Sequence, residues 1–405
     1  MSRRAHAPQR GGGPIERRAR PGRPLGMAPA EFLRDYWQKR PLLIRGAFAG
    51  FRSPVTPDDL AGLACEELAL ARIVVHEPGR DRWTLRHGPF AEDDFAGLPR
   101  THWTLLVQDV DKWDADVAAL LPHFGFLPSW RIDDVMISYA EDGGSVGAHV
   151  DQYDVFLLQG LGRRRWQIST DPQAPTAFRD DAELRLLRAF APTHEWILEP
   201  GDVLYLPPGV PHHGVALGAC MTYSIGMRAP SQAELLVDLA ETVAETLPET
   251  RRFADPDLAP ARGDGEIDEA ALARVRRALP LLGDVDPALL RAWFGRFITR
   301  YRSAQVVAPP GRALGDAAFA AALAGGARVR RNPWSRLAWL RSGNAATLFA
   351  SGADHRCSRA FARFVCSRAE FALAEAPGGA GDRAALRALL DGGHLALVRE
   401  RRRRR

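Results

Sequence analysis

Short apolar runs separated by turn residues dominate the middle of the chain, between residues 131 and 228. Apolar and polar positions alternate within the runs, and Gly and Pro recur between them, which is typical of strands in a β-sandwich or barrel. Upstream, helical spacing of apolar residues over Pro29–Gln38 precedes a short buried strand at Leu42–Ile44. The expected strands of the central stretch are Asp134–Ala140, Val155–Gln159, Arg164–Ser169, His194–Leu198, Asp202–Leu206, Val215–Leu217 and Met221–Gly226.

The spacing of apolar residues then changes from the period of a strand to that of a helix. Ser231 and Glu234 form a capping box, which predicts the start of a helix. A second helix is expected at about 267–279, and Asp286 followed by Pro287 predicts the start of a third. The apolar faces of these helices are too large for so small a bundle to bury. We therefore expect them to pack on the barrel or on a second copy of the chain.

A smaller unit of mixed secondary structure follows the linker at 308–311. Two apolar runs flank the tripeptide Ser342–Asn344, which is a hairpin signal. Helices combined with such a β-wing resemble a winged helix. The pattern predicts helices at Ala317–Ala324, Ser358–Cys366 and Asp382–Leu390, and a final strand at His394–Val398.

Length and composition describe a soluble globular protein of more than one domain. The 405 residues correspond to two or three domains, and 46% hydrophobic with 25% charged residues argues against global disorder. No apolar run approaches the roughly 20 residues that span a bilayer, and no secretory signal is visible. The four scattered cysteines lack metal-binding spacing, so we expect reduced thiols in a cytoplasmic protein.

Positive charge is concentrated at the two ends of the chain. Seven arginines and one glutamate give residues 1–26 a net charge of +6, and six arginines and one glutamate give residues 399–405 a net charge of +5. Because the whole chain carries +5, the body between these ends carries −6. Tails of this kind are usually solvated and disordered, although contact with nucleic acid through phosphates is also open.

His149 and Asp151 lie two residues apart, after a glycine-rich approach at 143–147. On an extended strand both side chains point to one face, and an imidazole and a carboxylate there can hold a metal from one side. A His-x-Asp pair alone is a weak signal because chance produces it often. Its glycine-rich approach and the apolar strand that follows make it more specific.

The segment PGDVLYLPPGVPHHG, at 200–214, carries a second motif. Its Gly, Pro and His spacing resembles the second motif of the cupin superfamily, in which a rigid turn aims one side chain into the barrel mouth. His212 falls at the ligand place, and His213 remains the alternative ligand. Together with His149 and Asp151, His212 completes a facial triad of two histidines and one carboxylate, which leaves metal positions open for a cosubstrate and oxygen.

Three consecutive arginines, Arg163 to Arg165, precede Trp166 and Ile168. Strand alternation places Arg164 on the same face as Trp166 and Ile168, which is the inward face, while Arg163 and Arg165 point the other way. A buried guanidinium needs an anionic partner, and a dicarboxylate such as 2-oxoglutarate supplies one. Ser138 could face the same cosubstrate.

Four segments carry a family resemblance: 36–48, 223–230, ISYAEDGGSVGAHVDQYDVFLLQGLGRRRW at 137–166 and the motif at 200–214. They resemble the Jumonji C-type 2-oxoglutarate oxygenases, and within these the ribosomal oxygenase subfamily. They are most similar to the bacterial ribosomal protein arginine hydroxylases. The similarity covers most of 27–300 and, more weakly, the C-terminal unit.

The resemblance implies an α+β protein with five parts. The expected parts are a disordered basic tail at 1–26, a double-stranded β-helix (jelly-roll or cupin) oxygenase domain at 27–230, a helical dimerisation region at 231–307, a winged-helix-like domain at 308–398 and a basic tail at 399–405. The winged-helix-like domain at 308–398 would then be the second domain that contains both helices and strands.

The resemblance also implies an activity and assigns residues to it. His149, Asp151 and His212 would bind Fe(II), Arg164 would bind the distal carboxylate of 2-oxoglutarate, and Ser138 would line the same pocket. With O₂, such an enzyme would hydroxylate the β-carbon of an arginine in a large-subunit ribosomal protein. It would work as a homodimer and would not be bound to a membrane.

Two other interpretations remain open at this point. One is a related Jumonji C oxygenase that acts on a histidine or a lysine of another protein. The other is a non-catalytic cupin whose winged-helix unit binds nucleic acid, which would require a basic recognition helix. The helix expected at Ser358–Cys366 contains arginines, but Phe361 and Phe364 at core spacing favour a scaffold helix.

Overall fold

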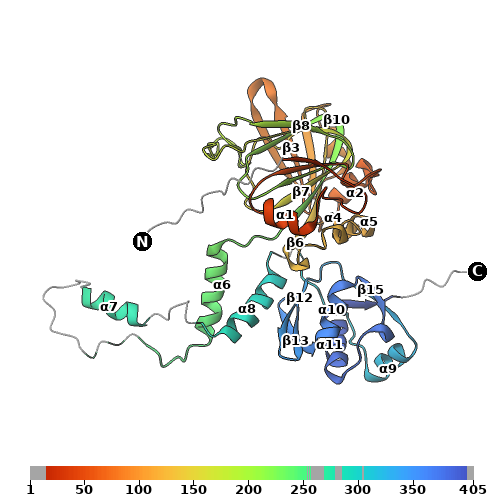
Figure 1. Cartoon of the computed structure of the whole chain (residues 1–405), viewed down its shortest axis with the longest axis vertical. Helices are drawn as coiled ribbons and strands as arrows, with labels where there is room; N and C mark the ends of the chain where they lie inside the picture. The colour runs from red at the N-terminus through yellow and green to blue at the C-terminus, as the bar shows by residue number, and fades with distance from the viewer. Residues whose placement is uncertain are drawn as a thin grey trace, which may run out of the picture. The chain divides into compact units, whose positions relative to one another are not determined.

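The structure is a computed structural model (Figure 1) that describes residues 15–252, 254, 256, 269–278, 285–302 and 305–398. The chain forms two compact units, residues 1–229 and 230–405. Of the two predicted basic tails, residues 1–14 and 399–405 lie outside the described residues.

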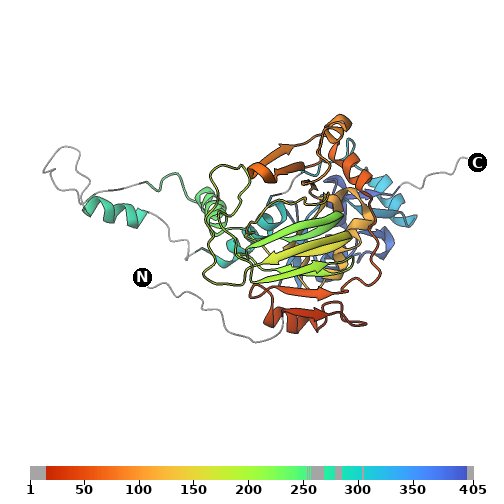
Figure 2. The ribbon, with the colours of Figure 1, turned by 90° about the horizontal axis from the view of Figure 1, so that it is seen from above.

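The N-terminal unit is built on a ten-stranded sheet with the order β1-β2-β9-β7-β10-β6-β5-β3-β4, and β8 also pairs with β7. Figure 2 shows the yellow and green central strands side by side, with red strands at one edge. Its strands are β1 (Glu16–Arg18), β2 (Leu42–Arg45), β3 (Ala71–Glu77), β4 (Arg82–His87), β5 (Trp103–Val107), β6 (Ile132–Ala140), β7 (Val155–Ile168), β8 (His194–Leu198), β9 (Val203–Leu206) and β10 (His212–Met227). Its helices are α1 (Pro29–Asp35), α2 (Pro57–Ala64), α3 (Glu92–Ala96), α4 (Val110–Trp113) and α5 (Ala115–Ala118).

Two long strands replace four of the predicted short ones. The strands expected at Val155–Gln159 and Arg164–Ser169 are joined in β7, and those expected at Val215–Leu217 and Met221–Gly226 are joined in β10. The pairing of β7 with β10 continues across the glycines at an irregularity in the ladder. Gly162 has a positive φ there, and a Cβ on it would lie 2.1 Å from the Ala219 carbonyl oxygen. The glycine therefore permits a bulge in one strand instead of ending it.

The described part of the expected N-terminal tail is ordered, which corrects the prediction for residues 15–26. Glu16–Arg18 form β1, which pairs in parallel with β2 at the edge of the sheet. Leu25 is buried in the hydrophobic core of the N-terminal unit. Backbone hydrogen bonds do not depend on side-chain charge, so an arginine-rich segment can still extend a sheet edge.

The first part of strand β7, residues 155–160, is buried on both faces. Phe156 and Leu158 face one core, which also contains Phe32 of α1. Val155 and Leu157 face a second core together with Trp166, Ile168, Leu198 and Leu204. Burying an aromatic or aliphatic side chain of this size stabilises a fold by roughly 1.5–3 kcal/mol. Both cores therefore hold β7 and its partner β10 in register.

The C-terminal unit contains two three-stranded sheets, with the orders β15-β11-β16 and β12-β13-β14. Its strands are β11 (Arg328–Arg331), β12 (Leu337–Ser342), β13 (Ala345–Ala350), β14 (Ala353–Ser358), β15 (Glu370–Ala372) and β16 (Leu395–Leu397). Its helices are α6 (Gln232–Glu245), α7 (Glu269–Ala278), α8 (Pro287–Arg300), α9 (Asp316–Ala324), α10 (Arg359–Ser367) and α11 (Ala380–Asp391). The predicted helices and hairpin are confirmed. The apolar pattern did not reveal β11 and β14, which are largely polar, or β15, which has only three residues.

Helices α6 and α8 begin at the residues that the capping signals predicted. The Ser231 hydroxyl accepts a hydrogen bond from the Glu234 N–H, and the Glu234 carboxylate accepts one from the Ser231 N–H. The Asp286 carboxylate caps α8 by accepting hydrogen bonds from the N–H groups of Ala288 and Leu289. The two helices are tied together because the Asp238 carboxylate accepts a hydrogen bond of 2.8 Å from Trp293 Nε1.

Across the described ranges, no helix has both the length and the apolar character needed to cross a membrane.

Candidate functional site

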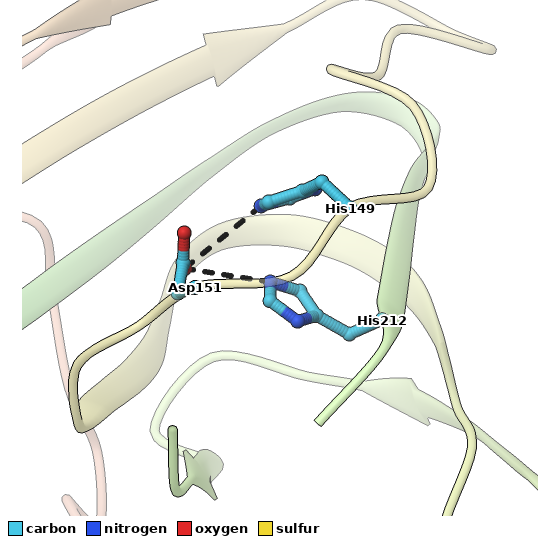
Figure 3. Close-up of side chains that lie close together, drawn as sticks. All are labelled: His149, Asp151 and His212. Carbon is cyan, nitrogen blue, oxygen red and sulfur yellow. Dashed lines mark ion pairs between the residues drawn. The ribbon is translucent and has the colours of Figure 1, made fainter. Parts of the chain in front are cut away.

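The side chains of His149, Asp151 and His212 converge on one point (Figure 3). Asp151 Oδ2 lies 3.9 Å from His149 Nε2 and 3.7 Å from His212 Nε2. One ligand atom from each residue lies within 4.8 Å of the other two. Three atoms bonded to one ion at about 2.1 Å are roughly 3–3.5 Å apart. The geometry therefore fits a single metal ion after a small contraction.

Backbone hydrogen bonds join the two motifs that supply the triad. The N–H of His149 donates to the carbonyl of His212, and the N–H of His212 donates to the carbonyl of His149, both at 3.0 Å. The N–H of Gly209 donates to the carbonyl of Asp151 at 2.8 Å. The two motifs are thus held together by the main chain, and the side-chain arrangement does not depend on a bound metal to bring them together.

Both histidines are oriented by carbonyl groups of their own loops. His149 Nδ1 lies 3.0 Å from the Gly147 carbonyl oxygen, and His212 Nδ1 lies 2.9 Å from the Val210 carbonyl oxygen. A carbonyl only accepts hydrogen bonds, so each Nδ1 carries the proton. This leaves the lone pair on each Nε2, which is the atom that faces Asp151. Both rings are therefore in the tautomer that a metal requires.

Burial keeps the second histidine of the triad neutral. His212 is buried, and burial, assisted by the nearby His149, lowers its pKa to about 4. His213, the alternative ligand, is absent from the cluster of potential ligands, and its ring contacts Phe190 edge-on with ring centroids 6.1 Å apart. The extended backbone of β10 turns the two neighbouring side chains in opposite directions.

Arg164 lies on the same inward face of β7 as Trp166, with 5% of its surface exposed. Its Nη1 donates to Ser138 Oγ at 3.2 Å and to Thr222 Oγ1 at 3.3 Å. Its Nε is buried without a hydrogen-bond partner, and no ion pair links it to a carboxylate in the described parts of the chain. A buried guanidinium that has no carboxylate partner is suited to bind an anion.

The neighbouring arginines differ in their surroundings. Arg163 is exposed, as strand alternation predicted. Arg165 is half-buried, and its Nε lacks a hydrogen-bond partner, so it is less exposed than we expected. Arg165 has a strand partner on each side, Ile197 of β8 and Val215 of β10, whereas Arg163 is paired only with Leu217 of β10.

Thr222 and Gln159 belong to the hydrogen-bonded cluster at Arg164, although the sequence analysis did not select them. Thr222 is paired with Ser138 of β6 and with Gln159 of β7. Its hydroxyl donates to Gln159 Oε1 at 3.1 Å, and Gln159 Nε2 donates to the Leu161 carbonyl at 2.9 Å. The available signal was a polar residue inside an otherwise apolar strand. These residues are brought together by the register of β6, β10 and β7, and local sequence patterns do not contain that register.

Trp166 lies between Arg164 and the triad residue His212. The centroid of its ring lies 5.9 Å from that of the His212 ring. The guanidinium carbon of Arg164 lies 5.7 Å from the same Trp166 centroid. Trp166 is buried, and its Nε1–H has no hydrogen-bond partner in the structure. The site therefore has a cationic end at Arg164, an indole with a spare donor and a metal-binding end.

The comparison with known families agrees with this arrangement. Residues 119–235 match the JmjC domain, and residues 280–396 match the ROXA-like winged helix. The chain is 41% identical over 280 residues to the ribosomal protein uL16 3-hydroxylase of Escherichia coli, which covers 69% of this chain and 74% of that protein.

The chain belongs to the JmjC-domain ribosomal oxygenases. The family resemblance inferred from the sequence motifs is thereby confirmed, as is the α+β fold with a cupin-type sheet and a winged-helix region. A probable ribosomal oxygenase of Haemophilus influenzae is 39% identical over 236 residues, which cover 58% of this chain and 56% of that protein.

A solved ribosomal oxygenase structure has the same fold. The Escherichia coli protein YcfD, in complex with cobalt and 2-oxoglutarate, superimposes with a TM-score of 0.76 and 35% sequence identity. The match covers 92% of this ribosomal oxygenase and 98% of the solved chain. That protein therefore provides a solved example of the family with a metal and a 2-oxoglutarate molecule.

Proposed function

We propose that this ribosomal oxygenase is an Fe(II)- and 2-oxoglutarate-dependent hydroxylase of ribosomal protein uL16. Its target would be the β-carbon of an arginine in that protein. The name of the Escherichia coli relative, ribosomal protein uL16 3-hydroxylase, supports this substrate and position. Because the substrate belongs to the large ribosomal subunit, we propose that the enzyme acts in the cytoplasm.

The observation that carries the proposal is the combination of the triad with a buried arginine that lacks an acidic partner. His149, Asp151 and His212 offer a carboxylate oxygen and two imidazole nitrogens, which suit Fe(II). Arg164 offers a buried guanidinium to the distal carboxylate of 2-oxoglutarate. A non-catalytic cupin would not need to keep all four groups.

The protein and the cofactors would divide the work between them. Iron, with 2-oxoglutarate and O₂ bound, supplies the oxidation of an unactivated C–H bond. Arg164, with Ser138 and Thr222 beside it, would fix the distal end of the cosubstrate and thereby orient its other end toward the triad. The indole of Trp166 would exclude water from the space between them.

Reaction of the purified enzyme with purified uL16 tests the proposal. With Fe(II) and 2-oxoglutarate, we expect one arginine of uL16 to gain the mass of one oxygen atom, located by fragmentation in a mass spectrometer. The His212→Ala variant should lose this activity, whereas His213→Ala should keep most of it, because only His212 belongs to the ligand cluster. Modification of a histidine or lysine instead would show a different substrate.

We also propose that the enzyme is a homodimer formed through residues 231–302. Large apolar side chains are exposed on all three helices of this region, including Leu236 of α6 at 52%, Val237 of α6 at 58% and Leu290 of α8 at 42%. Large apolar side chains exposed together in one region are commonly covered by another protein. A second copy is the occupant we favour, because the same helices in each copy can cover one another around a two-fold axis.

A further inference from the structure

We propose that the outward face of α10, in the winged-helix region, binds a single-stranded segment of RNA. Helix α10, labelled in Figure 1, has two faces that differ in burial. Phe361, Ala362 and Val365 are fully buried in the core of the C-terminal unit, so the scaffold role expected from the sequence holds for that face. The opposite face carries arginines that the core does not use.

The arginines of this face form a strip of positive charge. Arg356 precedes the helix, Arg359 and Arg363 are one turn apart on it, and Arg368 follows it. Arg356, Arg363 and Arg368 are exposed, and Arg359 is half-buried. Residues three and four apart on a helix are neighbours on its surface. Arg359 and Arg363 are therefore neighbours on the helix surface, and Arg363 lines the same pocket as Arg368.

Nearby carboxylates are already paired with other groups. Asp354 pairs with Arg296, and Glu370 pairs with Arg328 and Arg330. Within the described ranges, no ion pair joins a carboxylate to any of the four arginines of the strip. Their charge is therefore available to an external anion, and neighbouring guanidinium groups are suited to neighbouring phosphates.

A shallow pocket of about 400 Å³ lies on the same surface. It is lined by Ala360, Arg363, Phe364, Ser367 and Arg368. The guanidinium carbon of Arg368 lies 4.1 Å from the centroid of the Phe364 ring. Because this guanidinium lies over the face of the ring, an unpaired base would stack on the guanidinium plane or take its place on the ring. The pocket thus adds a place for a base to the place for phosphates.

Single-stranded RNA fits these features better than the alternatives. The major groove of an RNA duplex is too deep and narrow for a helix to enter, and its bases are not free to stack on a protein ring. An acidic peptide satisfies the charge but not the flat pocket. The choice of RNA over DNA rests on the proposed function, because a ribosomal protein substrate is surrounded by RNA.

Fluorescence anisotropy with the full-length protein and a labelled single-stranded RNA of mixed sequence tests the proposal. Arg359→Glu/Arg363→Glu should weaken binding at least tenfold at low salt. It should also lower the slope of log K against log salt by roughly 1.4, because two phosphate contacts at about 0.7 each are lost. The matched control Arg52→Glu/Arg100→Glu makes the same change of charge at exposed arginines of the N-terminal unit and should alter binding less than twofold.

A third variant tests the pocket itself. Phe364→Leu retains an apolar side chain against Phe371 but removes the flat ring, and it should weaken binding to the RNA about fivefold. Circular dichroism should show that each variant keeps the wild-type spectrum. The arginine-rich ends are unchanged in all variants, so their contribution cancels in the comparison.

Other outcomes would overturn the proposal. Equal losses in the test and control variants would mean that binding follows overall charge and not the strip. Competition by an oligoglutamate peptide as strong as that by unlabelled RNA would show an acidic protein partner, and equal binding of single-stranded DNA would contradict RNA as the ligand. RNA binding is measured without iron or turnover. A failure to bind RNA therefore says nothing against the proposed hydroxylase activity, and a failure to hydroxylate uL16 says nothing against RNA binding.

Discussion

His149 and His212 exchange two backbone hydrogen bonds of 3.0 Å, although they come from motifs far apart in the sequence. Their rings lie with centroids 4.2 Å apart, and the Nδ1 of each contacts a carbonyl of its own loop. The main chain therefore fixes both the separation and the tautomer of the two rings. Such preorganisation lowers the cost of metal binding, because little reordering of side chains is needed.

Arg164 is predicted to select the cosubstrate. Arg164→Ala should weaken 2-oxoglutarate binding by roughly 2–5 kcal/mol, because the distal carboxylate would be buried without a cation. Binding of Mn(II) should be unchanged, since no ligand of the triad is altered. Calorimetric titration of 2-oxoglutarate into the Mn(II)-loaded variant measures the loss. Arg163→Ala is the matched control because Arg163 is exposed, and an equal loss there would show that the arginine run acts as diffuse charge.

Thr222 is predicted to position Arg164. Its hydroxyl accepts a hydrogen bond from Arg164 and donates one to Gln159, so Thr222→Val removes both while keeping the shape of the side chain. A hydrogen bond to a charged group contributes about 1.5–3 kcal/mol. We expect KM for 2-oxoglutarate to rise about tenfold with a much smaller change in kcat. A fall in kcat with an unchanged KM would contradict a role at the distal carboxylate.

Asp134 is predicted to make stability depend on pH. Burial, and then the neighbouring Asp109 carboxylate, raises its pKa to about 7. The folded state therefore binds this proton more tightly than the unfolded state, and stability falls as pH rises from about 4 to about 7. Asp134→Asn keeps an acceptor for the Asp109 N–H but cannot ionise.

Thermal or urea unfolding at two pH values checks this prediction. Relative to wild type, Asp134→Asn should gain roughly 1–3 kcal/mol of stability between pH 5 and pH 8. Asp133→Asn, at the adjacent position, is a suitable comparison because its carboxylate bonds to the Arg228 guanidinium and should not give a gain. A difference between wild type and Asp134→Asn that is the same at both pH values would show that Asp134 is already ionised near pH 5.

The helical region is predicted to form the dimer interface. Multi-angle light scattering should give about twice the chain mass of 44.5 kDa at micromolar concentration. Leu236→Glu/Val237→Glu places two charges on the exposed face of α6 and should shift the protein toward the monomer. Leu161→Glu, at an exposed apolar residue of the N-terminal unit, should leave the mass unchanged. A monomeric wild-type protein would contradict the proposed interface.

The sequence predicted the metal-binding motifs better than the pocket around them. His149, Asp151 and His212 lie in short motifs with distinctive Gly and Pro spacing, and Arg164 follows from strand alternation. Thr222 was missed because it reaches Arg164 only through the register of three strands. Local patterns carry the direction of a side chain along one strand, but they do not carry its alignment with other strands.

The fold shows the same division between local and non-local information. Helices with capping residues, such as those beginning after Ser231 and Asp286, were predicted at their first turn. The continuity of β7 was missed because glycine was taken as a strand end, whereas Gly162 allows a bulge within a continuous ladder. Strand β1 was missed because its arginines suggested a solvated tail, although its backbone completes the sheet edge.

Intact-mass spectrometry of the large-subunit ribosomal proteins tests the central claim most directly. Two otherwise identical strains are compared, one with the wild-type gene and one with the His212→Ala allele at equal protein level. The account predicts that uL16 from the wild-type strain is heavier by the mass of one oxygen atom, on an arginine. Identical masses for uL16 in the two strains would contradict it.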